Sequence, residues 1–332
     1  MPVNRKLKIF LNYFLGPVIF IWVSFTIYHR IIRQPHLHEA WINIRHSLDD
    51  DRYWYLVLTL FLMLVNWGIE ARKWQLLVRQ LENISFTKAF YSVLTGVSIS
   101  VNTPNRVGEY GGRILYLKPE NRLKAISLNM ITSVSQLIVT VVMGIAGVVV
   151  LLCSFPLEIL HRNGLTAFWT DILLYGGLAF GVVTIVLYFR ISWLVRLLEA
   201  MPVLRKIIPY IRVLDHYEWP LLANMLLLST IRFVVFVSQY LLLFRLLYVD
   251  ASWWQGFWVV SVVMLILAVI PTITITEFVV RGETMITLMG LFSHNEFAIG
   301  LASFVIWIIN LIIPALAGSL LILGIKIIKD KE

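Results

Sequence analysis

Two polar motifs with the same internal spacing interrupt an otherwise very apolar chain. In the first, Pro104 is followed by Glu109 and Arg113, and in the second, Pro271 is followed by Glu277 and Arg281. In both motifs the arginine comes four residues after the glutamate, so the two side chains can pair across one turn of a helix. Long apolar segments flank both motifs, and charge inside a bilayer usually marks a substrate or ion path. We therefore predict that the working site lies at these motifs.

The residue types at the motifs suit the binding of an anion such as a phosphate. A helix that resumes after a break presents free N–H groups and a partial positive charge. Arg113 and Arg281 carry planar guanidinium groups for bidentate phosphate recognition, and Gly108 allows close approach of backbone or ligand. The alternative is that each glutamate and arginine neutralise one another and only pin the chain to its neighbours.

The composition defines a polytopic membrane protein. Apolar residues make up 59% of the chain and charged residues 14%, and the mean hydropathy is +0.81, far outside soluble usage. Cys153 is the only cysteine, which excludes a disulfide framework and a thiolate metal site. His36, His38 and His46 have the spacing of an ordinary polar loop, so we expect no metal and no cofactor.

Six apolar segments are long enough to cross a hydrocarbon core of about 30 Å as helices. They are residues 9–28, 54–71, 125–155, 168–189, 221–244 and 297–325. Two further segments, 88–118 and 255–292, contain the motifs and are broken near Pro104 and Pro271, since proline disrupts helical hydrogen bonding. We predict an all-α polytopic protein with six spanning helices and two re-entrant helical hairpins. The alternative is seven or eight full spans.

The net charge of +9 is concentrated in alternate loops. Basic residues precede the first predicted span, follow the second and fourth, and close the chain, whereas segments 156–167 and 249–255 contain almost none. The positive-inside rule then predicts that both termini face the cytoplasm. We expect the protein in the plasma membrane. These basic residues lie at helix ends, where they would contact anionic lipid headgroups, so nucleic-acid binding is not expected.

The order helix, broken hairpin, helix occurs twice with opposite orientation. It predicts an inverted repeat, the arrangement of many secondary transporters, in which broken helices meet near the bilayer midplane. The predicted units are an N-terminal helix and loop (1–53), a first half-repeat (54–155), a fourth helix with an amphipathic cytoplasmic linker (156–220), a second half-repeat (221–326) and a tail (327–332).

The motifs resemble those of a known family. The run Asn-Thr-Pro-x-Arg-x-Gly-Glu-x-x-x-Arg at 102–113 follows a helix that ends in Glu-Ala-Arg-Lys-Trp at 70–74, and Thr-Glu-x-x-x-Arg-Gly follows at 276–282. This pattern is similar to the lysylphosphatidylglycerol synthase transmembrane-region family, also called flippase-like integral membrane proteins. The resemblance covers roughly residues 50–325. It implies movement of a charged phospholipid between leaflets. Relatives also carry a soluble aminoacyl-transferase domain, but only six residues follow Lys326, so lipid aminoacylation is not expected here.

The resemblance and the motif chemistry together give a set of candidate substrate-binding residues, and no catalytic ones. Arg232 is included because it interrupts a predicted span. The set is Pro104, Arg106, Gly108, Glu109, Arg113, Glu277 and Arg281 from the motifs, Arg72 and Trp74 from the end of the second helix, and Arg232. We expect a flippase or scramblase of an anionic phospholipid or lipid-linked amphiphile. The alternatives are a membrane-embedded transferase with Glu109 or Glu277 as general base, or a receptor-like scaffold.

Overall fold

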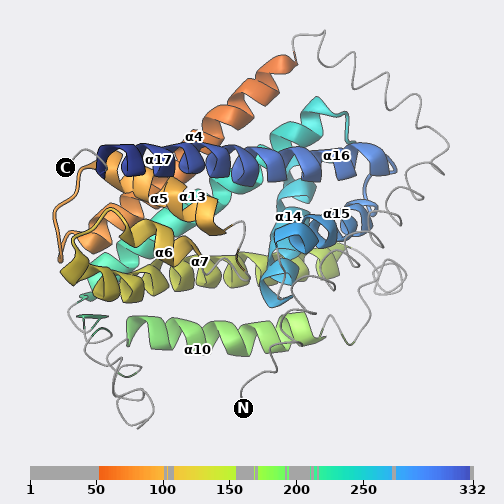
Figure 1. Ribbon diagram of the computed structural model, residues 1–332. Helices are drawn as coiled ribbons and strands as arrows, with labels where there is room; N and C mark the ends of the chain where they lie inside the picture. The colour runs from red at the N-terminus through yellow and green to blue at the C-terminus, as the bar shows by residue number, and fades with distance from the viewer. Residues whose placement is uncertain are drawn as a thin grey trace, which may run out of the picture.

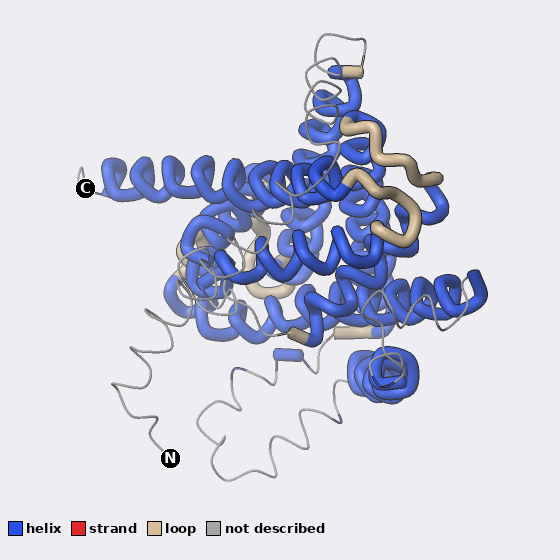
Figure 2. The backbone as a smooth tube through the Cα atoms, turned by 90° about the vertical axis from the view of Figure 1, so that its right-hand side faces the viewer, coloured by secondary structure: helices blue, strands red, loops and turns tan. Residues whose placement is uncertain are grey.

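The computed structural model describes residues 52–100, 103, 108–154, 168, 171–190, 193, 210, 213–214, 217–270 and 274–329. Throughout these ranges the ordered elements are helices, and no strand occurs (Figure 2). In chain order they are α4 (Tyr53–Val78), α5 (Phe86–Ser100), α6 (Gly108–Ile114), α7 (Pro119–Ser154), the π-helix η3 (Ile172–Gly176), α10 (Gly177–Phe189), α13 (Trp219–Leu246), α14 (Trp253–Val269), α15 (Thr274–Met289), α16 (Glu296–Trp307), the π-helix η6 (Ile308–Ile312) and α17 (Ile313–Lys329). The predicted all-α membrane class is confirmed.

Four of the six predicted spans are helices long and apolar enough to cross a membrane. They are α4, α7, α13 and the continuous helix from α16 through η6 into α17, which crosses the top of Figure 1. The predicted span at 168–189 corresponds to a shorter apolar helix, Leu174–Phe189. The predicted span at 9–28 lies outside the described residues, as do the three loop histidines and most of the linker at 191–216.

The two motif segments each form two helices separated by a break. In the first, α5 ends at Ser100 and α6 starts at Gly108; in the second, α14 ends at Val269 and α15 starts at Thr274. A helix rises about 1.5 Å per residue, so none of these arms reaches the roughly 20 residues that cross a bilayer. The arms α5 and α14 are 15 and 17 residues long, and α6 is only seven. Re-entry into a membrane stays a prediction that these lengths favour.

Helices α14 and α16 begin where a side chain satisfies one of their first N–H groups. Before α14, the Ser252 hydroxyl accepts a hydrogen bond from the Gln255 amide (3.2 Å) while the Gln255 side chain accepts one from the Ser252 amide (2.9 Å), which is a capping box. Asn295 caps α16 by accepting from the Ala298 amide at 3.1 Å. These caps fix the starts of α14 and α16, the helices that precede and follow α15 with the second motif.

Each broken segment packs on the long helix at the end of the other half of the chain. The first arm α5 lies along α17, and the first arm α14 lies along α7 (Figure 1). Glycines make both contacts close. A Cβ on Gly147 would lie 2.9 Å from the Trp258 carbonyl oxygen, and Cβ atoms on Gly144 and Gly318 would collide with Leu265 and Leu94. This reciprocal packing is what two repeats related by a two-fold axis would produce, and the inverted repeat itself stays a prediction.

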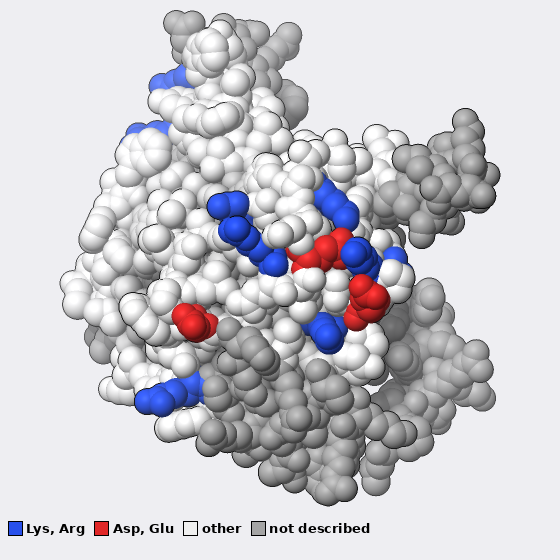
Figure 3. Space-filling model, turned by 90° about the vertical axis from the view of Figure 1, so that its left-hand side faces the viewer, with Lys and Arg blue, Asp and Glu red and all other residues white. Residues whose placement is uncertain are grey.

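Apolar side chains remain exposed around the outside of the bundle. Helix α10 lies against α7, and Leu178, Phe180, Val182 and Val183 on it are each more than half exposed. In Figure 3, charged side chains gather in one region of a largely uncharged face. A surface of this kind suits hydrocarbon, whereas a water-exposed monomer rarely shows such large apolar patches.

Candidate functional site

Helix α4 presents a buried polar stripe to the interior of the bundle. Asn66, Glu70 and Lys73 recur at i, i+4 and i+7, which places them on one helix face. Their exposed fractions are 3%, 4% and 0%. The Lys73 ammonium lies 3.4 Å from the Glu70 carboxylate and 3.4 Å from the Thr132 carbonyl oxygen. Burial of these groups demands partners from other helices, because an isolated buried charge is very costly.

Glu70 is the centre of a network that joins three helices. Its carboxylate oxygens lie 2.8 Å from Arg113 Nη2 of α6, 3.4 Å from Lys73 and 3.3 Å from Arg232 Nη1 of α13. Arg113 also pairs with Glu109, as its i+4 spacing predicted. One carboxylate therefore ties the first motif to the predicted site residue Arg232.

Both terminal nitrogens of Arg113 are held by neighbouring side chains. It is 1% exposed, its Nη1 donates to Asn129 Oδ1 at 2.8 Å, and its guanidinium lies 5.7 Å from the centre of the Trp74 ring. Its own carbonyl accepts a hydrogen bond from the Ser92 hydroxyl of α5 at 2.7 Å. Arg113 thus anchors α6 within the bundle, and its surroundings leave it little freedom to move toward a ligand.

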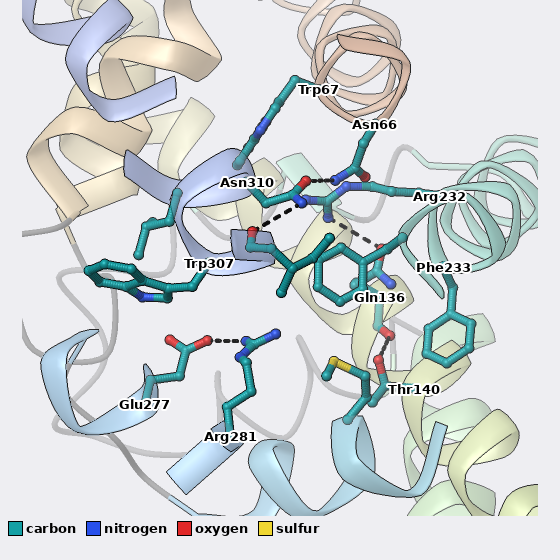
Figure 4. A pocket seen from close by; sticks show the side chains of 14 residues that line it. Asn66, Trp67, Gln136, Thr140, Arg232, Phe233, Glu277, Arg281, Trp307 and Asn310 are labelled. Atoms are coloured by element: carbon teal, nitrogen blue, oxygen red, sulfur yellow. Dashed lines mark hydrogen bonds and ion pairs between the residues drawn. The ribbon is translucent and has the colours of Figure 1, made fainter. Parts of the chain in front are cut away.

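The second motif faces a pocket. Glu277 and Arg281 pair with one another, and Arg281 Nη1 donates to the Tyr240 hydroxyl of α13 at 3.3 Å. Both motif side chains and Arg232 line a cavity of about 190 Å³, into which the two arginines point from different helices (Figure 4). The other lining residues are Asn66, Trp67, Gln136, Thr140, Phe233, Phe236, Met264, Ile306, Trp307, Asn310 and Leu311.

A π-helix supplies part of the pocket wall. Asn310 lies in η6, and its Oδ1 accepts a hydrogen bond from Asn66 Nδ2 of α4 at 3.1 Å. Its own Nδ2 donates to the Ile306 carbonyl at 3.3 Å. A π-turn widens the helix locally and is frequent at functional sites. Here it joins the long C-terminal helix to the same stripe of α4 that holds Glu70.

The seven charged groups of the network and the pocket do not balance. Lys73, Arg113, Arg232 and Arg281 are four cations, and Glu70, Glu109 and Glu277 are three carboxylates, which leaves one positive charge. Among the described residues, the buried Nε atoms of Arg113, Arg232 and Arg281 have no hydrogen-bond acceptor, and Arg232 and Arg281 line the pocket. Unused donors together with excess positive charge favour an anionic ligand.

The remaining predicted site residues differ in position. Pro104 and Arg106 lie outside the described residues. The Gly108 amide donates to Thr103 Oγ1 at 2.8 Å, and an added Cβ would lie 2.6 Å from the Ile99 carbonyl oxygen. Close backbone approach therefore explains this glycine, and its own N–H, one of those at the start of α6, already donates to Thr103. Trp74 is fully buried beside Arg113.

Arg72 is placed differently from its neighbours. It is exposed, its Nη1 donates to Gln75 Oε1 at 2.6 Å, and it is not among the residues that line the pocket. A binding role for Arg72 stays a prediction with no contact to support it. The sequence prediction missed Glu70, Lys73 and Asn66 as members of the site. The signal was present, since polar residues at i, i+4 and i+7 within an apolar helix define a buried face.

Another carboxylate, that of Glu82, lies outside the spanning helices and contacts both ends of the segment that contains the first motif. Glu82 Oε1 lies 3.2 Å from Lys88 Nζ at the start of α5, and its Oε2 accepts from the Lys118 amide after α6 at 3.0 Å. Burial raises the pKa of the Glu82 carboxyl, but the hydrogen bonds from Lys118 and Lys88 outweigh it, so the pKa falls below its ordinary value. Glu82 thus joins the two ends of the segment.

The fold and the site define an integral membrane protein with a buried, positively charged site between its helices. The sequence model of one family, described as the lysylphosphatidylglycerol synthase TM region, matches residues 13–318. This match covers most of the chain, and the chain belongs to that family, as the motifs predicted. Membership gives it a lipid-related function in a membrane. No curated protein matches the chain.

Proposed function

We propose that the protein transports an anionic phospholipid or lipid-linked amphiphile between leaflets, as a flippase or scramblase, and that Arg232 and Arg281 bind the headgroup. The observation that carries the proposal is that these two arginines reach one pocket from α13 and α15. Family membership supports a lipid as the substrate class. The excess positive charge of the surrounding network supports an anionic headgroup over a zwitterionic one.

The reciprocal packing of the two broken segments supports transport over simple binding. In transporters built from inverted repeats, one half rocks against the other around a fixed central site. The contacts of α5 with α17 and of α14 with α7 are the surfaces that such a motion would change. We place the protein in the plasma membrane with both termini in the cytoplasm, on the loop charges described above.

Leaflet exchange in liposomes tests the proposal. The full chain is reconstituted in vesicles of phosphatidylcholine and phosphatidylglycerol, and exchange of labelled forms of each lipid is measured. We expect exchange that favours phosphatidylglycerol. Arg281→Ala should slow it at least about tenfold, as expected from the loss of a charged hydrogen bond. Arg281→Lys should fall between, since it keeps the charge but loses the planar fork.

Controls separate transport from loss of folding and from chemistry. Arg79→Ala removes an exposed arginine at the end of α4 and should leave exchange unchanged, and size-exclusion profiles should match among the variants. If folded protein exchanges neither lipid, the transport proposal fails. If labelled lipid is recovered chemically altered, the alternative of a membrane-embedded transferase is correct.

A further inference from the structure

The polar pocket is too small for a whole amphiphile. Its volume of about 190 Å³ is below the roughly 300–1,000 Å³ of sites that enclose a drug-sized ligand. A lipid headgroup bound at Arg281 must therefore leave its acyl chains elsewhere. Their path has to begin at the pocket and be apolar, because burial of hydrocarbon against polar groups would leave those groups unsatisfied.

Helix α15 separates polar and apolar residues onto two adjacent faces. Glu277 and Arg281 line the polar pocket, whereas the residues that directly follow them, Phe278 and Gly282, line a second cavity. Successive residues on a helix differ by about 100° in direction. The same helix thus presents charged side chains to one cavity and apolar residues to the other.

The second cavity is a groove between α15 and α16. It has a volume of about 170 Å³, and its lining consists of phenylalanine, glycine, isoleucine and leucine only. Gly300 of α16 leaves room for a methyl group, since an added Cβ would come no closer than 3.4 Å to the Ile286 side chain. Phe304, at the other end of α16, is 39% exposed.

A cluster of three aromatic rings lies where the groove meets the polar pocket. The Phe278 ring lies 5.5 Å from the Trp307 ring and 5.4 Å from the Phe304 ring. Phe278 and Phe304 line the groove, and Trp307 lines the pocket. A ligand that extends past these rings contacts arginines at one end and apolar side chains at the other, which matches the order of groups in an amphiphile.

We propose that the groove between α15 and α16 binds one acyl chain of the lipid whose headgroup occupies the Arg232–Arg281 pocket. This inference rests on the proposed function, because it takes its headgroup site from there. The apolar lining of the groove favours hydrocarbon. The arginines of the adjoining pocket favour an occupant that is anionic at one end. The aromatic residues between the two sites contact both.

Photo-crosslinking with phosphatidylglycerol that carries a diazirine at the end of one acyl chain tests the groove. The purified full chain is labelled in vesicles of phosphatidylcholine and phosphatidylglycerol, and the modified peptides are mapped by mass spectrometry. We expect modification within 278–304. Gly300→Leu fills the groove and should reduce this modification on the order of tenfold, as expected when about two methylene groups lose their burial. Gly176→Leu is the matched control, since a Cβ there meets nothing closer than 4.0 Å.

The outcomes distinguish the groove from the transport activity. If modification falls on other helices, or persists unchanged in Gly300→Leu, the groove proposal is overturned even if leaflet exchange is normal. If modification maps to the groove and responds to Gly300→Leu while exchange is absent, the groove stands as a lipid site and transport is refuted. Gly300→Ala should label like the wild type, because its methyl group fits.

Discussion

Replacement of Glu70 by glutamine should destabilise the protein far more than a neutral substitution of one carboxylate elsewhere. The amide keeps the shape of the side chain, so no cavity forms, and only the charge is lost. In the native protein Glu70 lies within 2.8–3.4 Å of Arg113, Lys73 and Arg232. After the change, Arg113 keeps its pair with Glu109, whereas Lys73 and Arg232 lose the carboxylate that pairs with them among the described residues.

The size of the effect follows from burial. Glu70 is 4% exposed and Lys73 is fully buried, and removal of one partner from a buried ion pair typically costs about 3–5 kcal/mol. A whole protein is stable by only about 5–15 kcal/mol. We therefore expect the apparent melting temperature in detergent to fall on the order of 10 °C. Thermal unfolding followed by tryptophan fluorescence measures it.

Two companion variants make the reasoning refutable. Glu218→Gln changes an exposed carboxylate and should shift stability by less than about 0.5 kcal/mol. The double variant Glu70→Gln with Arg232→Gln restores the original excess of one positive charge. It should recover about 1–3 kcal/mol relative to the sum of the single changes. If Glu70→Gln unfolds at the same temperature as Glu218→Gln, the network is not the anchor that we describe.

Three further changes test other parts of the structure. The hydrogen bonds of Glu82 lower its pKa, so the stability that they provide is present above the unfolded pKa of 4.5 and is lost as the pH falls through the lower folded value. The thermal unfolding of Glu82→Gln should therefore depend less on pH in this acid range than that of the wild type. Gly144→Leu overpacks the contact of α7 with α14 and should cost about 1–3 kcal/mol in thermal unfolding, whereas Gly176→Leu should cost little. Asn310→Leu leaves the Asn66 amide without its acceptor and should cost about 1–3 kcal/mol, much of which a second change, Asn66→Leu, should recover.

The sequence was enough to predict the class of fold, and the motif arginines were found from their cost in a bilayer. Apolar runs predict helices well because a membrane requires every backbone group to be satisfied within its own segment. The break before α15 was predicted less well. The β-branched residues Thr274, Ile275 and Thr276 predict a break that lasts until Glu277, yet the structure starts α15 at Thr274, since helix propensity is a weak prior.

The partners of the motif arginines could not be predicted from spacing, because they come from other helices. The i+4 rule predicts Glu109 as the partner of Arg113 and Glu277 as the partner of Arg281, but it predicts no partner on another helix. That Glu70 joins Arg113 to Arg232 depends on how α4 lies between α6 and α13. The same rule makes the two motifs look equivalent, but the structure separates them. Arg113 is enclosed by Glu70, Glu109 and Asn129, whereas Arg281 faces a cavity. We infer that the first motif holds the site in place and that the second contacts the substrate. Substitution of Arg113 should therefore lower stability and exchange together, whereas Arg281→Lys, which keeps a positive charge beside Glu277, should lower exchange with little loss of stability.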